Sequence, residues 1–264
     1  MDRTSKYRRI VIKAGSNVLT RDDGRPDTTR ISSLVDQIAR LHRAGIEVIL
    51  VSSGAVASGR SVLEQRTGRI DTVSARQLFS AVGQVKLLNR YYDLFNEYGI
   101  VCGQVLTTKE SLSTRRQYLN QRNCMEVMLA NGVIPIVNEN DTVAIDELEL
   151  EIGENDSLSA TVAAAVGADL LIILSDINGL YSADPRTDAN AQVIREVRKI
   201  DARIEQMAGG AGSALGSGGM ATKINAAKIA TEAGVDMVIM NGRDPEQLYA
   251  LFDGEPIGTH FLAE

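Results

Sequence analysis

The sequence has few of the residues on which most metal centres and nucleophilic active sites depend. Among its 264 residues there are two cysteines, Cys102 and Cys124, and two histidines, His42 and His260. The cysteines have neither CxxC spacing nor a neighbouring histidine, so the sequence offers no zinc ligand set. Ser-His-Asp and Cys-His mechanisms have almost no candidates, because each needs a histidine beside its nucleophile. We expect both cysteines to be small core residues and both histidines to lie at the surface or to have structural roles.

Positive net charge and long apolar runs are also lacking. Lys and Arg number 28 against 34 Asp and Glu, which gives a net charge of -6. That sign opposes sequence-independent binding to phosphate backbones, so we expect no nucleic-acid partner. No apolar run approaches the roughly 18 residues of a membrane span, and residues 1–9 are polar and basic. These features predict a cytoplasmic chain that does not attach to membranes.

The sequence alternates short β-branched runs with longer amphipathic segments, a pattern typical of βα units around a mostly parallel sheet. Its length suits one large α/β domain or two modest ones. The pattern predicts strands at residues 10–12, 48–51, 100–106, 133–137, 170–174 and 237–240, and a β-ribbon at 143–151. It predicts helices at residues 29–44, 74–98, 116–131, 157–166 and 220–233, and a short one near Pro245. In the long helix at 74–98 we expect these side chains to face inward: Leu78, Val82, Val85, Leu88, Tyr92 and Phe95.

Polar and glycine-rich segments follow the predicted strands, at the edge where open parallel sheets bind ligands. They are residues 13–17, 52–55, 138–141, 153–156, 175–176 and 216–223. Any one of them could be ordinary turn chemistry. Six at one edge indicate a ligand site.

The last of these segments, GSGGMATK, opens a predicted helix. Glycines that expose backbone N–H groups at a helix N-terminus, with a lysine beside them, favour a phosphate and therefore a nucleotide. The P-loop spacing is absent. Gly216, Gly218 and Ala221 fit the dinucleotide pattern GxGxxA, but no strand precedes them, which makes an NAD-dependent oxidoreductase the weaker interpretation.

Two lysines in these segments, Lys13 and Lys223, need a shared partner if both face one polyanion. Burying an ammonium alone is costly, and two of them about 4 Å apart would repel by roughly 4 kcal/mol at an effective dielectric near 20. A carboxylate between them would hold both charged, and Asp156, at a predicted helix start, is the best candidate. The alternatives are that the lysines reach solvent and that Asp156 is an N-cap.

Eight motifs, in order along nearly the whole chain, resemble those of the glutamate 5-kinases of the amino acid kinase superfamily. They are KAGSNVLT (13–20), SSGAVASG (52–59), AVGQ (81–84), NENDTV (138–143), GENDSLSA (153–160), SDINGLY (175–181), DPR (184–186) and GSGGMATK (216–223). One departure is Glu154, where the family commonly has Asp. The charge is kept, so only local geometry is affected.

The resemblance implies a three-layer α/β/α sandwich and ATP-dependent phosphorylation of the L-glutamate γ-carboxylate, the first step of proline biosynthesis. It implies an amino-acid lobe at about 8–165, an ATP lobe at about 166–264, and no RNA-binding-type PUA domain. It also implies homo-oligomers, a dimer or tetramer, and feedback by proline at a site overlapping that of glutamate, where residues 64–74 could form a loop.

The same resemblance assigns roles to individual residues. Catalysis falls to Lys13, Lys223 and Asp156, and glutamate binding to Ser53, Gly54, Asn138, Asp141 and Asn155. ATP binding falls to Lys13, Gly15, Ser175, Asp176, Ser217, Gly218, Gly219, Met220, Ala221, Thr222 and Lys223, with Mg²⁺ bridging the phosphates.

This assignment agrees with the scarcity of histidine. A carboxylate with a pKa near 4.3 is already ionised at neutral pH, so the reaction needs no general base. We expect Asp141 to pair with the substrate ammonium, and Ser53 and Asn155 to serve its carboxylates. Two alternatives stay open: a sister kinase for N-acetylglutamate, aspartate or UMP, and a catalytically silent amino-acid sensor.

Overall fold

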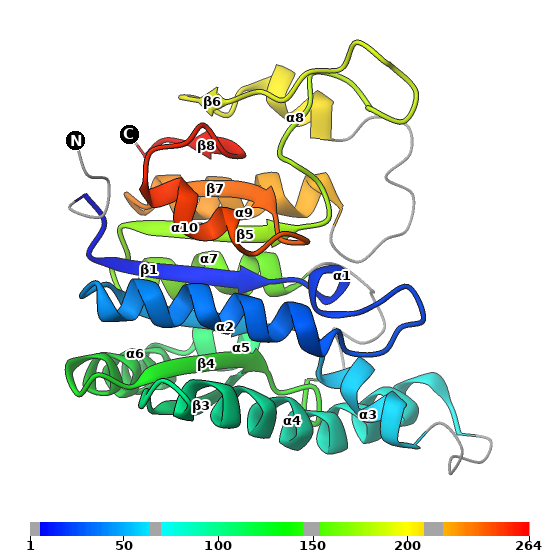
Figure 1. Cartoon of the computed structure of the whole chain (residues 1–264), viewed down its shortest axis with the longest axis vertical. Helices are drawn as coiled ribbons and strands as arrows, with labels where there is room; N and C mark the ends of the chain where they lie inside the picture. The colour runs from blue at the N-terminus through cyan, green and yellow to red at the C-terminus, as the bar shows by residue number, and fades with distance from the viewer. Residues whose placement is uncertain (1–5, 64–69, 145–153, 209–218, 264) are drawn as a thin grey trace.

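The computed structural model describes residues 6–63, 70–144, 154–208 and 219–263. Its centre is an eight-stranded sheet in the order β3-β4-β2-β1-β5-β7-β8-β6. Figure 1 shows this sheet from β6 at the top to β3 at the bottom. The strands are β1 (Arg9–Ala14), β2 (Glu47–Ser52), β3 (Cys102–Thr107), β4 (Ile134–Glu139), β5 (Leu170–Ser175), β6 (Glu196–Val197), β7 (Asp236–Asn241) and β8 (Thr259–Phe261). The pairs from β3 to β7 are all parallel, whereas β8 runs antiparallel to β7.

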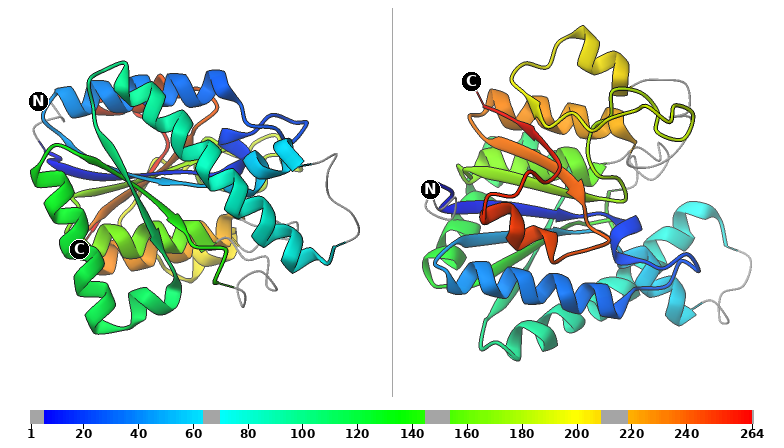
Figure 2. Two further views of the ribbon diagram at one scale, coloured as in Figure 1. Left: turned by 90° about the horizontal axis from the view of Figure 1, so that it is seen from below. Right: turned by 45° about the horizontal axis from the view of Figure 1, so that its top comes forward.

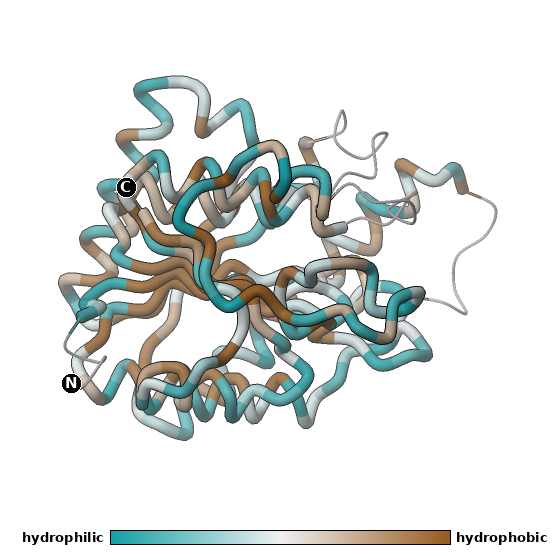
Figure 3. Tube along the Cα trace, turned by 90° about the horizontal axis from the view of Figure 1, so that it is seen from above, coloured by the Kyte–Doolittle hydropathy of each residue, from teal (hydrophilic) through white to brown (hydrophobic). Residues whose placement is uncertain are grey.

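Helices cover both faces of the sheet, which confirms the predicted three-layer α/β/α sandwich (Figure 2). One face carries α1 (Ser16–Leu19), α2 (Thr28–Arg43), α4 (Thr72–Asn96) and α10 (Gln247–Phe252), with α3 (Ala55–Leu63) packed against α4. The other carries α6 (Arg115–Ala130), α7 (Glu154–Ala165), α8 (Ala202–Ala208) and α9 (Met220–Glu232), with α5 (Lys109–Ser113) next to α6. Apolar segments gather in the central strands in Figure 3, as expected for a parallel sheet buried on both faces.

The alternation of side chains along β1 separates the two cores. Ile10, Ile12 and Ala14 face the layer of α2, while Val11 faces the layer of α7 and α9. Side chains two residues apart in a strand share a face, so Lys13 points to the same side as Val11. This alternation decides which helices can reach the lysine.

The long predicted elements are confirmed, with ends shifted by at most three residues. Gly45 follows the C-cap of α2 with a φ of 88°, the conformation that glycine commonly adopts just after a helix. Four short helices, α1, α3, α5 and α8, were not predicted, nor were two short strands, the edge strand β6 and its neighbour β8, because each is too brief to show a clear period. The β-ribbon predicted at 143–151 falls mostly outside the described residues.

Two predictions about the core are wrong. Cys124 is exposed and Cys102 only partly buried, so the cysteines are not core residues. In α4, Val85 is 62% and Tyr92 54% exposed, and Leu78 is exposed as well. The helix instead buries a face that contains Ser80, Gly83 and Gln84 beside its apolar residues Leu87, Tyr91, Leu94 and Phe95. Phe95 is buried as predicted and Leu88 packs against the core, so the prediction is wrong at Leu78, Val85 and Tyr92. Pattern analysis treats small and polar residues as surface, so it did not find the buried Ser80, Gly83 and Gln84.

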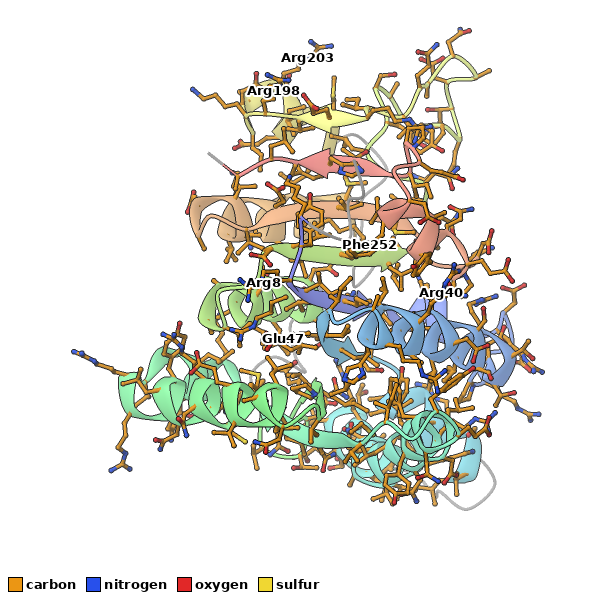
Figure 4. The ribbon with its side chains drawn as sticks, turned by 60° about the vertical axis from the view of Figure 1, so that its left-hand side comes forward. Arg8, Arg40, Glu47, Arg198, Arg203 and Phe252 are labelled. Atoms are coloured by element: carbon orange, nitrogen blue, oxygen red, sulfur yellow. The ribbon has the colours of Figure 1, made fainter. Side chains whose placement is uncertain are left out.

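The edge formed by the amino ends of the strands is held by charge pairs (Figure 4). Arg8 and Glu47 mark this edge, beside the starts of β1 and β2. Arg9 Nε lies 2.6 Å from Glu47 Oε2, and Lys6 Nζ lies 2.8 Å from Asp236 Oδ2. The first contact joins the neighbouring strands β1 and β2, and the second ties the segment before β1 to the start of β7. Ala263 N donates to the same Asp236 side chain, so the two ends of the described chain lie near each other.

Candidate active site

The predicted ligand segments meet at the carboxyl ends of the strands. The sheet register aligns Ala14 with Ser52 on one side and with Leu174 on the other, and Ser175 with Asn241. Loops that leave β1, β2, β5 and β7 therefore start from one edge, and residues far apart in the sequence become neighbours there.

Lys13, Asp156 and Lys223 form the buried centre of this edge. Lys13 reaches from β1 toward α7 and α9, and Asp156 and Lys223 lie in the first turns of those helices. Lys13 Nζ lies 2.6 Å from Asp156 Oδ1, and Lys223 Nζ lies 3.2 Å from Asp156 Oδ2. Thr222 Oγ1 donates a third contact to Asp156 Oδ2 at 2.9 Å. The carboxylate thus lies between the two ammonium groups, as the sequence predicts.

Burial makes this cluster electrostatically costly without a ligand. Lys13 is 7%, Lys223 4% and Asp156 1% exposed. Burial lowers the pKa of Lys13, although Asp156 opposes this, and repulsion by Lys223 lowers it further. Burial would raise the pKa of Asp156, but the two lysines overcome that effect and hold it below its ordinary value. Asp156 is therefore shared by two ammonium groups, and Asp176 acts on Lys13 as well; two oriented cations of this kind suit a phosphate.

Asn155 and Ser53 connect the start of α7 to the turn after β2. Asn155 Nδ2 donates to Ser53 Oγ at 2.7 Å. Asn155 Oδ1 is buried and has no hydrogen-bond partner among the described residues. The neighbouring Gly54 has a φ of 99°, a conformation that favours glycine and turns the chain from β2 into α3. Asn155 Oδ1 is therefore a buried acceptor at the site, and a donor from a ligand could bond to it.

Asn138 and Asp141 lie at and just beyond the end of β4, and both contact α4. Asn138 Nδ2 donates to Gln84 Oε1 at 2.8 Å, and Ser80 Oγ donates to Asp141 Oδ2 at 2.8 Å. Sequence reasoning did not identify Ser80 or Gln84 as functional. The sequence does contain one signal: Ser80 and Gln84 are polar residues one helical turn apart, next to Gly83, in a helix whose buried face was assigned from its apolar residues alone.

On the other side of Lys13 lie the residues predicted to hold ATP. Ser175 Oγ donates to Asp176 Oδ1 at 3.2 Å, and Asn17 Nδ2 to Asp176 Oδ2 at 3.4 Å. A Cβ on Gly15 would lie 3.3 Å from Lys13 Nζ, so a side chain there would crowd the lysine.

Gly219 caps α9, and none of the described side chains bonds to its first backbone N–H groups. Met220 and Ala221 form the start of that helix, ahead of Thr222 and Lys223. Ser217 and Gly218 lie outside the described residues. Backbone N–H groups at the start of a helix are a place where an anion can bind.

The described residues contain neither a metal cluster nor a membrane-spanning helix. No group of three or more His, Cys, Asp or Glu side chains could hold a metal ion there. Within the same ranges, no helix combines the length and the apolar character needed to cross a membrane.

Comparison with known proteins bears on the family of the chain. Residues 8–241 match the model of the amino acid kinase family. The chain is 54% identical to the glutamate 5-kinase of Bacteroides thetaiotaomicron over 97% of its own length and 71% of that protein's. It is 46% identical to the glutamate 5-kinase of Clostridium acetobutylicum over 98% of its own length and 96% of that protein's.

Two solved structures share the fold at low identity. The UMP kinase of Bacillus anthracis superposes with a TM-score of 0.64 at 16% identity, covering 98% of this chain and 97% of that one. The carbamate kinase of Giardia lamblia bound to AMP-PNP gives a TM-score of 0.67 at 16% identity, covering 98% and 100%. With the sequence relatives above, they lead to one conclusion: this chain belongs to the amino acid kinase family, within its glutamate 5-kinase branch.

Proposed function

We propose that the chain transfers the γ-phosphoryl group of ATP to the side-chain carboxylate of free L-glutamate, giving γ-glutamyl phosphate and ADP. This is the first step of proline biosynthesis. The observation that carries the proposal is the buried Lys13–Asp156–Lys223 cluster at the strand ends, in a chain 54% identical to a glutamate 5-kinase. The cluster supplies the chemistry of phosphoryl transfer, and the relatives indicate the acceptor.

The reaction requires alignment and charge neutralisation more than proton transfer. The attacking carboxylate is ionised at neutral pH, so what opposes reaction is its repulsion by the triphosphate. Lys13 and Lys223 would bind the oxygens of the transferring phosphoryl group, where negative charge develops between the acceptor and the leaving ADP. Asp156 holds both ammonium groups within 3.2 Å of its oxygens before the substrate arrives. The lysines are therefore oriented in advance, which reduces the reorganisation needed at the transition state.

The amino-acid pocket needs acceptors for an ammonium and donors for a carboxylate. The Asp141 carboxylate and the buried Asn155 Oδ1 are acceptors, and we assign the substrate ammonium to them. Ser53 Oγ accepts from Asn155, so its own proton is available to donate to a carboxylate of glutamate. Gly54 and Asn138 complete the lining. Asn155 therefore serves the ammonium in this arrangement, in place of the carboxylate role first expected.

On the nucleotide side, we assign ATP to Ser175, Asp176, Gly15 and the start of α9 from Gly219 to Lys223, with Ser217 and Gly218 preceding it. The described residues offer no cluster of three metal ligands. Mg²⁺ would accordingly enter as part of the MgATP substrate, held by its phosphates. The protein's own share is the cationic pair and the backbone N–H groups at the helix start.

Several properties of the family extend the proposal. We assign residues 8–165 to the amino-acid lobe and 166–264 to the ATP lobe. We also propose a cytoplasmic homo-oligomer, a dimer or tetramer, that proline inhibits at a site overlapping that of glutamate. Gel filtration with light scattering, and inhibition of turnover by proline at several glutamate concentrations, test these assignments.

Formation of γ-glutamyl hydroxamate from ATP, glutamate and hydroxylamine tests the proposed reaction. Parallel reactions with aspartate, N-acetylglutamate or UMP in place of glutamate measure ADP release. We expect turnover with glutamate to exceed that with each alternative by at least about 100-fold, because unpaired buried polar groups penalise a substrate without the right partners. Faster ADP release with one of the alternatives would identify a sister kinase, and no ADP release with any of them would support a sensor.

A further inference from the structure

Helix α4 contacts the segment after β4 through a polar stripe formed by Gln77, Ser80 and Gln84. Gln84 accepts from Asn138, Ser80 donates to Asp141, and Gln77 Nε2 donates to the carbonyl oxygen of Thr142 at 3.0 Å. The stripe follows the helical spacing of three and four residues, which puts its members on one side of α4. Successive turns of α4 therefore contact residues 142, 141 and 138 in turn.

The position of this stripe is fixed by a close crossing of α3 and α4. A Cβ on Gly83 would lie 1.7 Å from the carbonyl oxygen of Ala55, and one on Gly59 would lie 1.8 Å from that of Phe79. Both distances are far below van der Waals contact, so the two backbones touch where only glycine fits. Ala55 begins α3 directly after the turn at Ser53 and Gly54. The crossing thus ties the polar stripe to the other half of the amino-acid pocket.

We propose that Ser80 and Gln84 are positioning residues that set the recognition of the substrate's α-ammonium. This inference rests on the proposed function and assigns the two residues a part in it. Ser80 is 3% exposed and donates its hydroxyl proton to Asp141, and Gln84 accepts from the Asn138 carboxamide, whose Oδ1 in turn accepts from the backbone N–H of Glu139.

The physical reason lies in the two rotatable bonds of Asp141. This half-buried side chain lies in the turn that follows β4, and a hydrogen bond to Oδ2 restricts the rotamers it can adopt. A hydrogen bond from Ser80 fixes one oxygen and with it the plane of the carboxylate. Hydrogen bonds to a charged acceptor are among the stronger ones in proteins, so this contact can hold the orientation that an ammonium needs.

A double-mutant cycle of Ser80→Ala and Asp141→Ala separates positioning from general stability. We expect Ser80→Ala to lower kcat/KM for glutamate about 10-fold, the effect of losing one charged hydrogen bond, while kcat/KM for ATP at saturating glutamate changes less than about twofold. In the Asp141→Ala background the same substitution should change kcat/KM for glutamate less than about twofold, because the partner is already gone. Gln84→Met, which keeps length and loses the acceptor, should likewise affect glutamate and spare ATP.

Ser61→Ala is the matched control. Ser61 Oγ accepts from Lys86 Nζ at 3.0 Å, so it also bridges α3 and α4, but it lies outside the stripe. We expect no change in either kcat/KM. Equal losses in both Asp141 backgrounds, a parallel loss for ATP, or no loss at all would overturn the inference while leaving the proposed function intact. Absence of glutamate-dependent turnover in the unsubstituted protein would overturn the proposed function and this inference with it.

Discussion

Replacing Asp156 by asparagine removes the only charge that separates Lys13 from Lys223 among the described contacts of the cluster. The side chain keeps its size, so the change tests charge with little change in packing. In the unsubstituted protein the carboxylate oxygens lie 2.6 Å from Lys13 Nζ and 3.2 Å from Lys223 Nζ. Both ammonium groups are almost fully buried, so solvent cannot replace the lost partner.

The distances set the size of the expected effect. At an effective dielectric of 20 the attractions are about 6 and about 5 kcal/mol for contacts of 2.6 and 3.2 Å, before the cost of desolvation is subtracted. Breaking a buried ion pair by removing one partner costs about 3–5 kcal/mol in proteins. Both ammonium groups lose the Asp156 carboxylate here, so we expect the upper end of that range, about 5 kcal/mol. For a chain of this size that lowers the melting temperature by about 10–20 °C.

The pH dependence follows from the shifted pKa values. The pKa of Asp156 is lowered in the folded state, so its stabilisation is complete above the ordinary carboxyl pKa and is lost as pH falls through the lower folded value. The pKa of Lys13 is also lowered, so the folded state gains stability as pH rises toward the ordinary lysine value and the ammonium loses its proton. The difference between the two proteins should therefore be largest near neutral pH and should shrink at both extremes.

Thermal unfolding followed by circular dichroism, with and without MgATP, provides the assay. ATP supplies negative charge where the carboxylate is missing, so it should raise the melting temperature of the Asp156→Asn protein more than that of the unsubstituted one. Glu126→Gln is the control, because that carboxylate holds an ion pair with Arg122 on the solvent-exposed side of α6. It should cost less than about 1 kcal/mol. Melting of the Asp156→Asn protein within about 2 °C of the unsubstituted protein would refute the reasoning.

Three further predictions concern single residues. Lys223→Ala should reduce turnover about 10²- to 10³-fold, the cost of losing one preorganised donor to the transition state, and near-normal turnover would remove Lys223 from the catalytic assignment. Asp141→Asn should raise KM for glutamate at least about 10-fold and leave KM for ATP unchanged, whereas equal effects would place Asp141 outside the amino-acid pocket. Gly83→Ala should destabilise the fold by about 3 kcal/mol or more in urea unfolding, because the new Cβ meets the Ala55 carbonyl oxygen at 1.7 Å. Ala81→Gly, on the exposed side of the same helix, should cost only about 1 kcal/mol, and an equal loss would show that the crossing tolerates a side chain.

The catalytic cluster could be predicted from sequence for two reasons. Its residues are constrained by their charges, and its place in the molecule is constrained by the topology of the sheet. Two lysines next to predicted strand and helix ends must share a partner if one polyanion binds both, and the strand order brings such ends to one edge. The same argument placed Asp156 between them, where the structure finds it. The long elements were predictable for a similar reason, since their periodicity extends over many residues.

The residues that support the site could not be found in this way. Ser80 and Asp141 are 61 positions apart, and neither local segment contains a pattern that predicts their contact. The close crossing at Gly59 and Gly83 could not be predicted either. In a sequence, a glycine within a helix indicates only lower helix stability, and its role becomes clear once the facing backbone is seen. Only the three-dimensional arrangement shows that these residues serve the same pocket.

The error in α4 has a functional origin. An apolar stripe that includes Val85 and Tyr92 is exposed, while Ser80, Gly83 and Gln84 are buried. A helix selected for stability alone would bury the apolar stripe, since each fully buried side chain of that kind contributes about 1.5–3 kcal/mol. Burying Ser80 and Gln84 instead gives up part of this stabilisation. The fold tolerates their burial because both side chains are hydrogen-bonded. Local rules fail most often where a site must be built, so the helix face that misleads pattern analysis is also the face that positions the substrate-binding residues.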